Sequence, residues 1–318
     1  MCEFNPLVSI IIPVYNGSNY MREAIDSALA QTYKNVEVVV VNDGSRDNGE
    51  TERIAKEYGD KIRYIYKENG GVSTALNTGI KSMNGDYFSW LSHDDVYTQD
   101  KIEKQIKALS KLEDKSTLIC CGSVNIDKNS KLIGNMPEVN QTDVKHLEWD
   151  KVLMQLLQRG TVNGCALLIK RTVFDDVGLF DEDLRFNQDG FMWNKIFLKQ
   201  YSMLCIPDIC VKGRIHSKQL TQTGQALFHR DCEVMSCFMI PNLMRISTHD
   251  RNFILAYIKY NAKYGNQAVV KNAYSEAKKE KLITAKDHVL ILLICGYGLI
   301  RPILRKTYYI IFRRINTK

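Results

Sequence analysis

Short apolar runs alternate with segments of helical periodicity along the first hundred residues. Residues 8–12 and 36–41 are β-branched runs that end in polar turns, and apolar residues recur at helical spacing in 19–31 between them. Continuous apolar runs are typical of strands buried on both faces. Further strands are predicted at 62–66 and 86–91, and helices at 53–58 and 73–83. This order predicts an α/β fold with a doubly wound, mostly parallel sheet and flanking helices.

The pattern changes after the fourth predicted strand. Residues 118–124 and 131–135 flank a polar turn and predict a hairpin outside the parallel layer. Beyond residue 225 the sequence is helical and carries no clear motif. The other predicted elements are helices at 101–112, 152–158 and 191–200 and a strand at 164–169. We therefore expect a domain over 1–224 with halves of about 1–115 and 116–224, a C-terminal helical extension over 225–288, and a basic amphipathic tail over 289–318.

Composition and charge exclude several classes of protein. Apolar residues make up 45% of the 318 residues and charged residues 25%, as in folded globular proteins. The formal net charge is +7, but residues 289–318 hold six basic residues and no acid, so the rest sums to about +1. Because the folded body lacks a basic excess, we expect no nucleic-acid partner.

The cysteines indicate a reducing compartment. They number nine, an odd count, and none has the C-x-x-C spacing of a metal site. No secretory signal precedes the first predicted strand. We therefore expect reduced thiols and a cytoplasmic protein.

Four polar turns follow the predicted strands. The carboxyl ends of parallel strands meet at one edge of the sheet, where doubly wound proteins bind their ligands. We therefore expect these turns to form one site. They contain Tyr15 and Asn16, Asp43, Asn69 with Gly70 and Gly71, and Asp94 with Asp95.

The adjacent carboxylates Asp94 and Asp95 are the candidate metal site. Mg²⁺ and Mn²⁺ prefer oxygen ligands and are usually held by one or two carboxylates together with substrate phosphates. The pattern predicts that Asp95 holds the cation, while Asp94 contacts a ribose hydroxyl or a metal-bound water. A helix N-cap before the helix at 101–112 is the alternative for these residues.

Two other turns offer weaker signals for a nucleotide. Asp43 could accept a hydrogen bond from a base imide or a ribose hydroxyl, or it could form an Asx-turn that supports Gly44. The amides of Gly70 and Gly71 could approach a phosphate at a helix N-terminus, although glycine pairs before helices are common.

Three residues in the second half of the domain are candidates for chemistry. Asp189 could act as a general base on an acceptor hydroxyl, or it could cap the helix that follows it. His216 could bind a metal or a pyrophosphate, with Arg214 nearby, or it could be a structural hydrogen-bonding residue.

The order of these motifs resembles the family 2 glycosyltransferases of GT-A fold. The resemblance covers roughly residues 7–220. It rests on Val8-Ser-Ile-Ile-Ile-Pro-Val-Tyr-Asn16, Val39-Val-Val-Asn-Asp-Gly-Ser45, Asn69-Gly-Gly-Val-Ser73, Gly85-Asp-Tyr-Phe-Ser-Trp-Leu-Ser-His-Asp-Asp95, Gly164-Cys-Ala-Leu-Leu-Ile-Lys-Arg171 and Val177-Gly-Leu-Phe-Asp-Glu182.

The resemblance implies inverting transfer of a sugar from a nucleoside diphosphate, with UDP the most frequent in the family, to an acceptor hydroxyl. It implies Mn²⁺ or Mg²⁺ as cofactor. It places Pro13, Tyr15 and Asp43 at the nucleoside, Asp94 and Asp95 in the metal-binding motif with Asp95 as the direct ligand, His216 near the diphosphate, and Asp189 as the catalytic base. We further expect Asn16, Asn69, Gly70, Gly71, Asp94 and Arg214 to contact the donor and His216 to bind the metal.

Three positions depart from the family pattern. Leu76 stands where the family often has an arginine, so an expected basic contact is missing. His93 replaces the first acid of the metal motif. Gln188 replaces the first acid of the pair before the last helix, so Asp189 is the one carboxylate that can serve as the base there.

The tail predicts attachment to a membrane. Its apolar stretch 289–300 is too short to span a bilayer, and the mixed aromatic, aliphatic and basic residues that follow suit the interface of an anionic leaflet. We expect the protein to lie at the inner face of the cell membrane. We expect its acceptor to be a glycan, or a lipid-linked glycan of a surface polysaccharide. The alternative is a helix that packs on the body or on the partner of a homodimer.

Two other functions remain open at this point. One is a nucleotidyltransferase that forms sugar nucleotides, but the turn after the first strand carries no cation for a phosphate. The other is a sugar-nucleotide-binding assembly subunit without activity, against which Asp95 and Asp189 argue.

Overall fold

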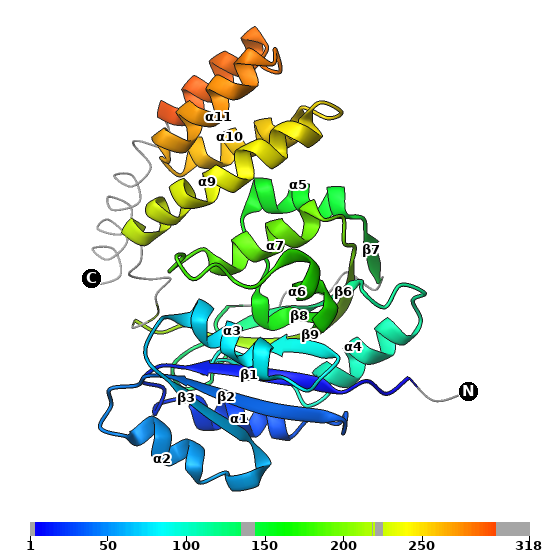
Figure 1. Ribbon diagram of the computed structural model, residues 1–318, viewed down its shortest axis with the longest axis vertical. Coiled ribbons are helices and arrows are strands. Elements are labelled where there is room, and N and C mark those ends of the chain that lie inside the picture. Colours follow the sequence, from blue (N-terminus) through cyan, green and yellow to red (C-terminus); the bar gives the residue numbers. More distant parts are fainter. Residues whose placement is uncertain (1–3, 135–143, 218, 220–224, 297–318) are drawn as a thin grey trace. The chain divides into compact units, whose positions relative to one another are not determined.

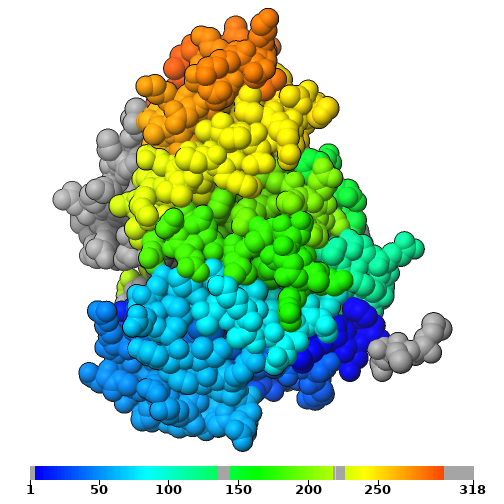
Figure 2. Space-filling view, in the orientation of Figure 1, coloured from blue at the N-terminus to red at the C-terminus, as the bar shows by residue number. Residues whose placement is uncertain are grey.

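A computed structural model describes residues 4–134, 144–217, 219 and 225–296. The chain divides into two compact units. The first comprises residues 1–153 and 161–224, and the second comprises 154–160 and 225–318. Side chains fill the space between the neighbouring elements of each unit (Figure 2).

The first unit is built around a nine-stranded sheet in the order β3-β2-β1-β4-β8-β6-β9-β5, with β7 paired to β9. Its first four strands are parallel, as the apolar runs predicted. Every residue of β1 and β4 is buried, which explains their continuous apolar sequence. These strands are β3 (Arg63–Lys67), β2 (Val36–Asp43), β1 (Val8–Val14) and β4 (Tyr87–Trp90).

Helices cover both faces of the parallel strands, with α3 (Val72–Ser82) on one face and α1 (Met21–Leu29) on the other (Figure 1). The α3 helix approaches β1 so closely that a side chain on Gly79 would overlap Ile11, so this position requires glycine. The predicted doubly wound arrangement is confirmed. The other helices of this half are α2 (Glu50–Lys56), η1 (Gly59–Lys61) and α4 (Lys101–Ser110).

The second half of the sheet is mixed. The strand β8 (Leu167–Lys170) runs antiparallel to β4 and to β6 (Leu118–Ile126), while β6 and β9 (Met203–Arg214) are parallel. The short strands β5 (Val96–Tyr97) and β7 (Lys145–Leu147) pair antiparallel with β9. The helices of this half are α5 (Trp149–Arg159), η2 (Gly164–Ala166), α6 (Arg171–Val177) and α7 (Gln188–Leu198).

The predicted hairpin over 118–124 and 131–135 forms only at its turn, where the Asp127 amide donates to the Lys131 carbonyl at 2.8 Å and the Ile133 amide to the Asn125 carbonyl at 2.9 Å. Contrary to the prediction, its first strand does not lie outside the main sheet. The strand β6 lies inside the sheet between β8 and β9, and a single bridge, Ile126–Leu132, joins it to the following segment. Both faces of β6 are buried near its start, as expected for a strand inside a covered sheet. Residue 135 of the predicted second strand lies outside the described residues.

The second unit is helical, as predicted for the sequence beyond residue 225. Its described helices are α9 (Gln225–Ser247), α10 (Asn252–Lys263), α11 (Gln267–Lys279) and a further helix over 285–296, with Leu243, Ile254 and Ala273 in a fully buried core. No helix among the described residues is long and apolar enough to cross a membrane. Residues 297–318, most of the predicted tail, lie outside the described residues.

Candidate active site

The polar turns that follow the parallel strands meet at one edge of the sheet, as predicted. The register aligns Val14 at the end of β1 with Asn42 of β2, and Asn42 in turn with Tyr66 of β3. The turn after β4 joins the same edge because Leu91 donates its amide hydrogen to the carbonyl of Ile11 in β1. The parallel pairing thus gathers the candidate residues.

Asp43 is the anchor of the loop that follows β3. Its carboxylate is buried and accepts hydrogen bonds from the amides of Gly70 at 3.0 Å and Gly71 at 2.7 Å. The Asn69 side-chain amide, the Thr74 hydroxyl and the Lys67 ammonium, 2.6 Å away, are further partners. The two glycine amides, which were predicted to face a phosphate, are therefore occupied by the carboxylate that was predicted to face the nucleoside.

A basic residue that the sequence analysis missed lies beside this loop. Arg185 donates a hydrogen bond to the Gly70 carbonyl, and a side chain on Gly71 would overlap its guanidinium. Leu76, where the family pattern has a basic residue, is completely buried in α3. Arg185 thus brings a positive charge to the Gly70–Gly71 turn from another part of the chain.

The turn after β1 is locked to the turn after β2. The Asn16 side chain accepts a hydrogen bond from the Arg46 amide at 2.7 Å, and the Asn16 amide donates to the Ser45 hydroxyl at 2.9 Å. Asn16 has φ 49°, a left-handed conformation that asparagine tolerates. Pro13 is buried within β1, whereas Tyr15 is 43% exposed at this edge. Tyr15 is thus open to contact with a ligand.

Asp94 and His216 face each other across the second part of the site. The imidazole Nε2 lies 3.1 Å from Oδ2 of Asp94, and the Gln219 amide donates to the same oxygen at 3.2 Å. His93 lies close enough to both for their charges to act on it, but burial dominates and lowers its pKa. The structure therefore brings together two predicted ligands from distant parts of the sequence.

Asp95 lies deeper than Asp94 and uses both carboxylate oxygens within the protein. Its Oδ1 accepts the Arg214 amide at 2.9 Å, and its Oδ2 accepts the Cys165 thiol at 3.4 Å. Burial, together with the neighbouring Asp94 carboxylate, raises the pKa of Asp95 to about 7. Asp95 is therefore held in place before any ligand is considered.

The Arg214 guanidinium has a different role from the predicted contact with the donor. It is completely buried and binds Glu23 of α1 at 2.9 Å, the Asp94 carbonyl at 2.8 Å and the Asp127 carbonyl at 3.1 Å. It also lies 4.4 Å from the centre of the Tyr20 ring. Because its donors serve the protein, Arg214 fixes the segments that carry Asp94 and Asp95 rather than facing a ligand.

The side chains present fit a cation that shares its coordination with a substrate. Among the described residues, no three His, Cys, Asp or Glu side chains are gathered in a way that could hold a metal alone. Asp94 and His216 provide an oxygen and a nitrogen at one point, and Asp95 follows directly. Divalent cations at phosphate sites commonly take one or two protein carboxylates and complete their shell with phosphates and water.

Asp189 lies at the start of α7 and faces a cavity of about 290 Å³. Its Oδ1 accepts the Gly190 amide at 2.7 Å, and burial raises the pKa of its carboxyl to about 6. Cys165, which binds Asp95, and Ser92 line the same cavity. The candidate base and the support of the candidate metal site therefore share one cavity. Its other lining residues are Trp90, Asn163, Gly164, Phe186 and Gln188.

Two polar atoms of the lining residues have no hydrogen-bond partner among the described residues. They are the indole Nε1 of Trp90, which can donate, and the Oε1 of Gln188, which can accept; both atoms are buried. Leaving such a group unpaired costs about 1–3 kcal/mol, so it normally has a partner. Sugar hydroxyls can satisfy a donor and an acceptor at once.

A glycine fixes one wall of this cavity. A side chain on Gly164 would overlap the Trp90 ring, so the indole rests directly on the backbone of η2. Trp193 of α7 lies behind it, with its Nε1 donating to the Val162 carbonyl at 3.1 Å. The position of the Trp90 indole, which forms this wall of the cavity, is therefore fixed by the backbone of Gly164.

The sequence comparisons place the chain in a family. Residues 9–178, more than half of the chain, match the family model "Glycosyl transferase family 2", and the chain belongs to this family. An uncharacterized glycosyltransferase of Rickettsia prowazekii (strain Madrid E) is 53% identical over 70% of this chain and 68% of that protein. One of Rickettsia bellii (strain RML369-C) is 56% identical over 69% of this chain but 31% of that protein. The chain thus matches only about a third of this longer relative.

Solved structures confirm the GT-A fold. The crystal structure of S. aureus TarS 1-349 in complex with UDP-GlcNAc superposes with a TM-score of 0.68 over 92% of this chain and 88% of that one, at 16% identity. The crystal structure of S. aureus TarS gives a TM-score of 0.66 over 92% of this chain and 53% of that chain. Likeness at this identity establishes the fold.

The Cys165 thiol provides a test of how Asp95 is held. Because its hydrogen bond favours the ionised carboxylate, Cys165→Ala is expected to raise the pKa of Asp95 above about 7, while Cys165→Ser keeps a donor and leaves it nearly unchanged. A ¹³C NMR titration of the Asp95 carboxyl measures this directly. An unchanged pKa in the alanine variant would show that the thiol contact is without influence.

Proposed function

We propose that this chain is a metal-dependent, inverting glycosyltransferase that moves a sugar from a nucleoside diphosphate, UDP, to an acceptor hydroxyl. The observation that carries the proposal is the cavity that Asp189 and the Asp95-binding Cys165 line together. This cavity has room for a sugar between the Asp189 carboxylate, which can accept a proton, and the proposed diphosphate site beside Asp95. The fold neighbour that was crystallised with UDP-GlcNAc supports a uridine donor.

The chemistry divides between the two ends of this cavity. A bound Mn²⁺ or Mg²⁺ would offset the negative charge on the leaving diphosphate, and Asp95 and His216 would hold it. Asp94, 3.1 Å from His216, contacts the donor beside it. Asp189 accepts the proton of the acceptor hydroxyl. Its raised pKa, about 6, brings it closer to neutral pH than an ordinary aspartate, which makes it a stronger base.

The remaining donor contacts follow from the sheet edge. Tyr15, which is exposed, stacks on or lines the base, with Pro13 and Asn16 shaping the turn beneath it. Asp43 and the Asn69–Gly71 loop form one hydrogen-bonded unit, so they act on the nucleoside together. Arg185 supplies the charge that Leu76 does not.

The proposed acceptor is a lipid-linked glycan of a cell-surface polysaccharide, and the proposed location is the inner face of the cell membrane. The basis is the charge of the chain. Residues 225–318 contain 16 Lys and Arg against 6 Asp and Glu, and residues 1–224 contain 27 against 30. An anionic membrane attracts the first region and not the second.

The base is tested by Asp189→Asn. Loss of the carboxylate is expected to lower the transfer rate by about 10²–10⁴-fold, while donor affinity changes little because the residue lies at the acceptor end. In the unsubstituted protein the rate should fall about tenfold per pH unit below pH 6, where Asp189 takes up a proton. Initial rates of UDP release and calorimetry with UDP-GlcNAc measure both. Unchanged transfer by Asp189→Asn would rule out its role.

The metal site is tested by Asp95→Ala in a panel of UDP-, GDP- and dTDP-sugars with Mn²⁺ or Mg²⁺. The variant should lose the increase in donor affinity that the cation gives, and the donor affinity measured in EDTA should stay the same. Asp60→Ala, which removes an exposed carboxylate in η1, is the matched control. Equal metal-dependent thermal shifts in Asp95→Ala and the unsubstituted protein would contradict the assignment.

The tail is tested by charge removal, which preserves the length of the chain. Replacing Arg301, Arg305, Lys306, Arg313, Arg314 and Lys318 with glutamine removes roughly 1 kcal/mol of attraction for each residue near an anionic surface. The variant should no longer sediment with membranes, while transfer to a water-soluble acceptor is kept. Sedimentation equal to that of the unsubstituted protein would refute attachment through the tail.

A further inference from the structure

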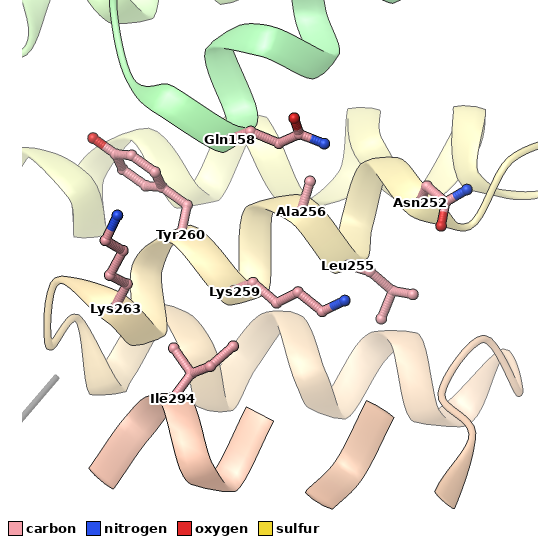
Figure 3. A pocket seen from close by; sticks show the side chains of 8 residues that line it. All are labelled: Gln158, Asn252, Leu255, Ala256, Lys259, Tyr260, Lys263 and Ile294. Carbon is pink, nitrogen blue, oxygen red and sulfur yellow. The ribbon is translucent and has the colours of Figure 1, made fainter. Parts of the chain in front are cut away.

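The second unit contains a cavity of about 380 Å³ along α10. Asn252, Leu255, Ala256, Lys259, Tyr260 and Lys263 of α10 line it, together with Gln158 and Ile294. Figure 3 shows α10 passing between the helix end that carries Gln158 and the helix that carries Ile294. The cavity belongs to the second unit and is separate from the donor site.

The cavity carries positive charge without a matching acid. Lys259 and Lys263 lie one turn apart on α10, and no Asp or Glu is among the lining residues. Neither lysine forms a salt bridge with the described residues, whereas Lys279 and Arg251 nearby each have a carboxylate partner. Lys263 also lies 5.7 Å from the centre of the Tyr264 ring. Their side chains point in opposite directions along α10 in Figure 3, Lys259 toward Leu255 and Lys263 toward the Tyr260 hydroxyl. A negatively charged group that enters the pocket therefore meets a cation toward either end of it.

The rest of the lining is apolar and continues onto the surface. Leu255 and Ala256 are buried beside the two lysines. Ile294 belongs to the helix over 285–296, on which Val289 is 56% exposed and Leu293 is 67% exposed. Leu290 and Leu292 on the same helix are also exposed. An exposed apolar cluster of this kind marks a surface that contacts a protein or a membrane.

We propose that this cavity, which we call the α10 pocket, binds the phosphate headgroup of an anionic phospholipid in a bilayer. Lys259 and Lys263 contact the phosphate, and Leu255 and Ile294 contact the first carbons of the lipid. The exposed apolar residues of 289–293 enter the interface beside the headgroup. The basic excess of this region, ten Lys and Arg against six Asp and Glu over 225–296, attracts the same surface.

The chemistry of the pocket argues against two other occupants. The tail of the chain, residues 297–318, holds six basic residues and no acid, so it does not complement two lysines. A soluble phosphate would not need the apolar part of the lining. The inference deepens the proposed membrane attachment and rests on it, but it is independent of the transfer reaction because binding needs no donor.

The test uses the full-length chain and vesicles of phosphatidylcholine with or without phosphatidylglycerol. Lys259→Gln with Lys263→Gln should weaken binding to the anionic vesicles at least tenfold. Lys271→Gln with Lys278→Gln, two exposed lysines of α11, removes the same charge and should weaken it less than threefold. Ala256→Phe, which fills the cavity and keeps both charges, should match the first variant. Circular dichroism and transfer to a soluble acceptor check that each variant is folded.

The outcomes separate the pocket from the tail and from other ligands. If the two lysine-pair variants lose the same amount of vesicle binding, the effect comes from total charge alone and the pocket proposal is overturned. If inorganic phosphate competes fully with the vesicles, the pocket binds a soluble anion and the proposal is overturned. If binding requires an isoprenyl phosphate in the vesicles and phosphatidylglycerol does not replace it, the ligand is a lipid carrier and the proposal is likewise overturned. If only the glutamine tail variant leaves the vesicles, membrane attachment stands and the pocket falls. If the two lysine pairs and the tail variant behave as expected on vesicles but the unsubstituted protein transfers no sugar, the enzymatic proposal alone falls.

Discussion

The buried guanidinium of Arg214 is the interaction on which the site depends. It joins α1 through Glu23, the turn after β4 through the Asp94 carbonyl and the turn after β6 through the Asp127 carbonyl. Removing a guanidinium from water is costly unless every donor finds an acceptor, so these segments cannot separate without leaving a buried charge unpaired. The Arg214 amide binds Asp95 at the same time. One residue at the end of β9 thus sets the positions of both acidic residues.

The donor half uses the same principle with opposite charges. Asp43 is a buried anion, and its partners are the Lys67 ammonium and the amides of Gly70 and Gly71. The turn after β3 is ordered around it, in the way that the turns after β4 and β6 are ordered around Arg214. Each half of the site is therefore built around one buried ion whose partners all belong to the protein. Tyr15, Asp94 and His216 are less enclosed than these two ions and remain the candidates for contact with a ligand.

The sequence predicted the parallel half of the fold well because its strands are apolar on both faces. Ile10–Ile12 of β1 and Val38–Val41 of β2 are β-branched runs, and the polar residues that meet at the edge follow them. It did not predict β9, because Pro207, Asp208 and Gly213 interrupt its pattern. The structure accommodates Pro207 at an irregularity in the pairing of β9 with β6, where a ladder hydrogen bond is not required.

The candidate site shows the same division. Short motifs were enough to select Asp94, Asp95, Asp189 and His216 as candidates, but the contacts that surround them depend on distant segments of the chain. Cys165 and Arg185 were missed because a thiol and a lone arginine carry no local signal, and Arg214 was taken for a donor contact because burial of its side chain depends on Glu23 and Tyr20. Pairing over more than a hundred residues decides such roles.

The contact between Trp90 and the backbone at Gly164 has a consequence for how the family can diversify. A wall made of indole on bare backbone cannot recede, because no smaller residue than glycine exists behind it. With the indole kept, more room in the cavity has to come from other lining positions, such as Asn163 and Phe186, which carry ordinary side chains. Relatives that accept different sugars should therefore vary at these two positions while keeping the tryptophan and the glycine together.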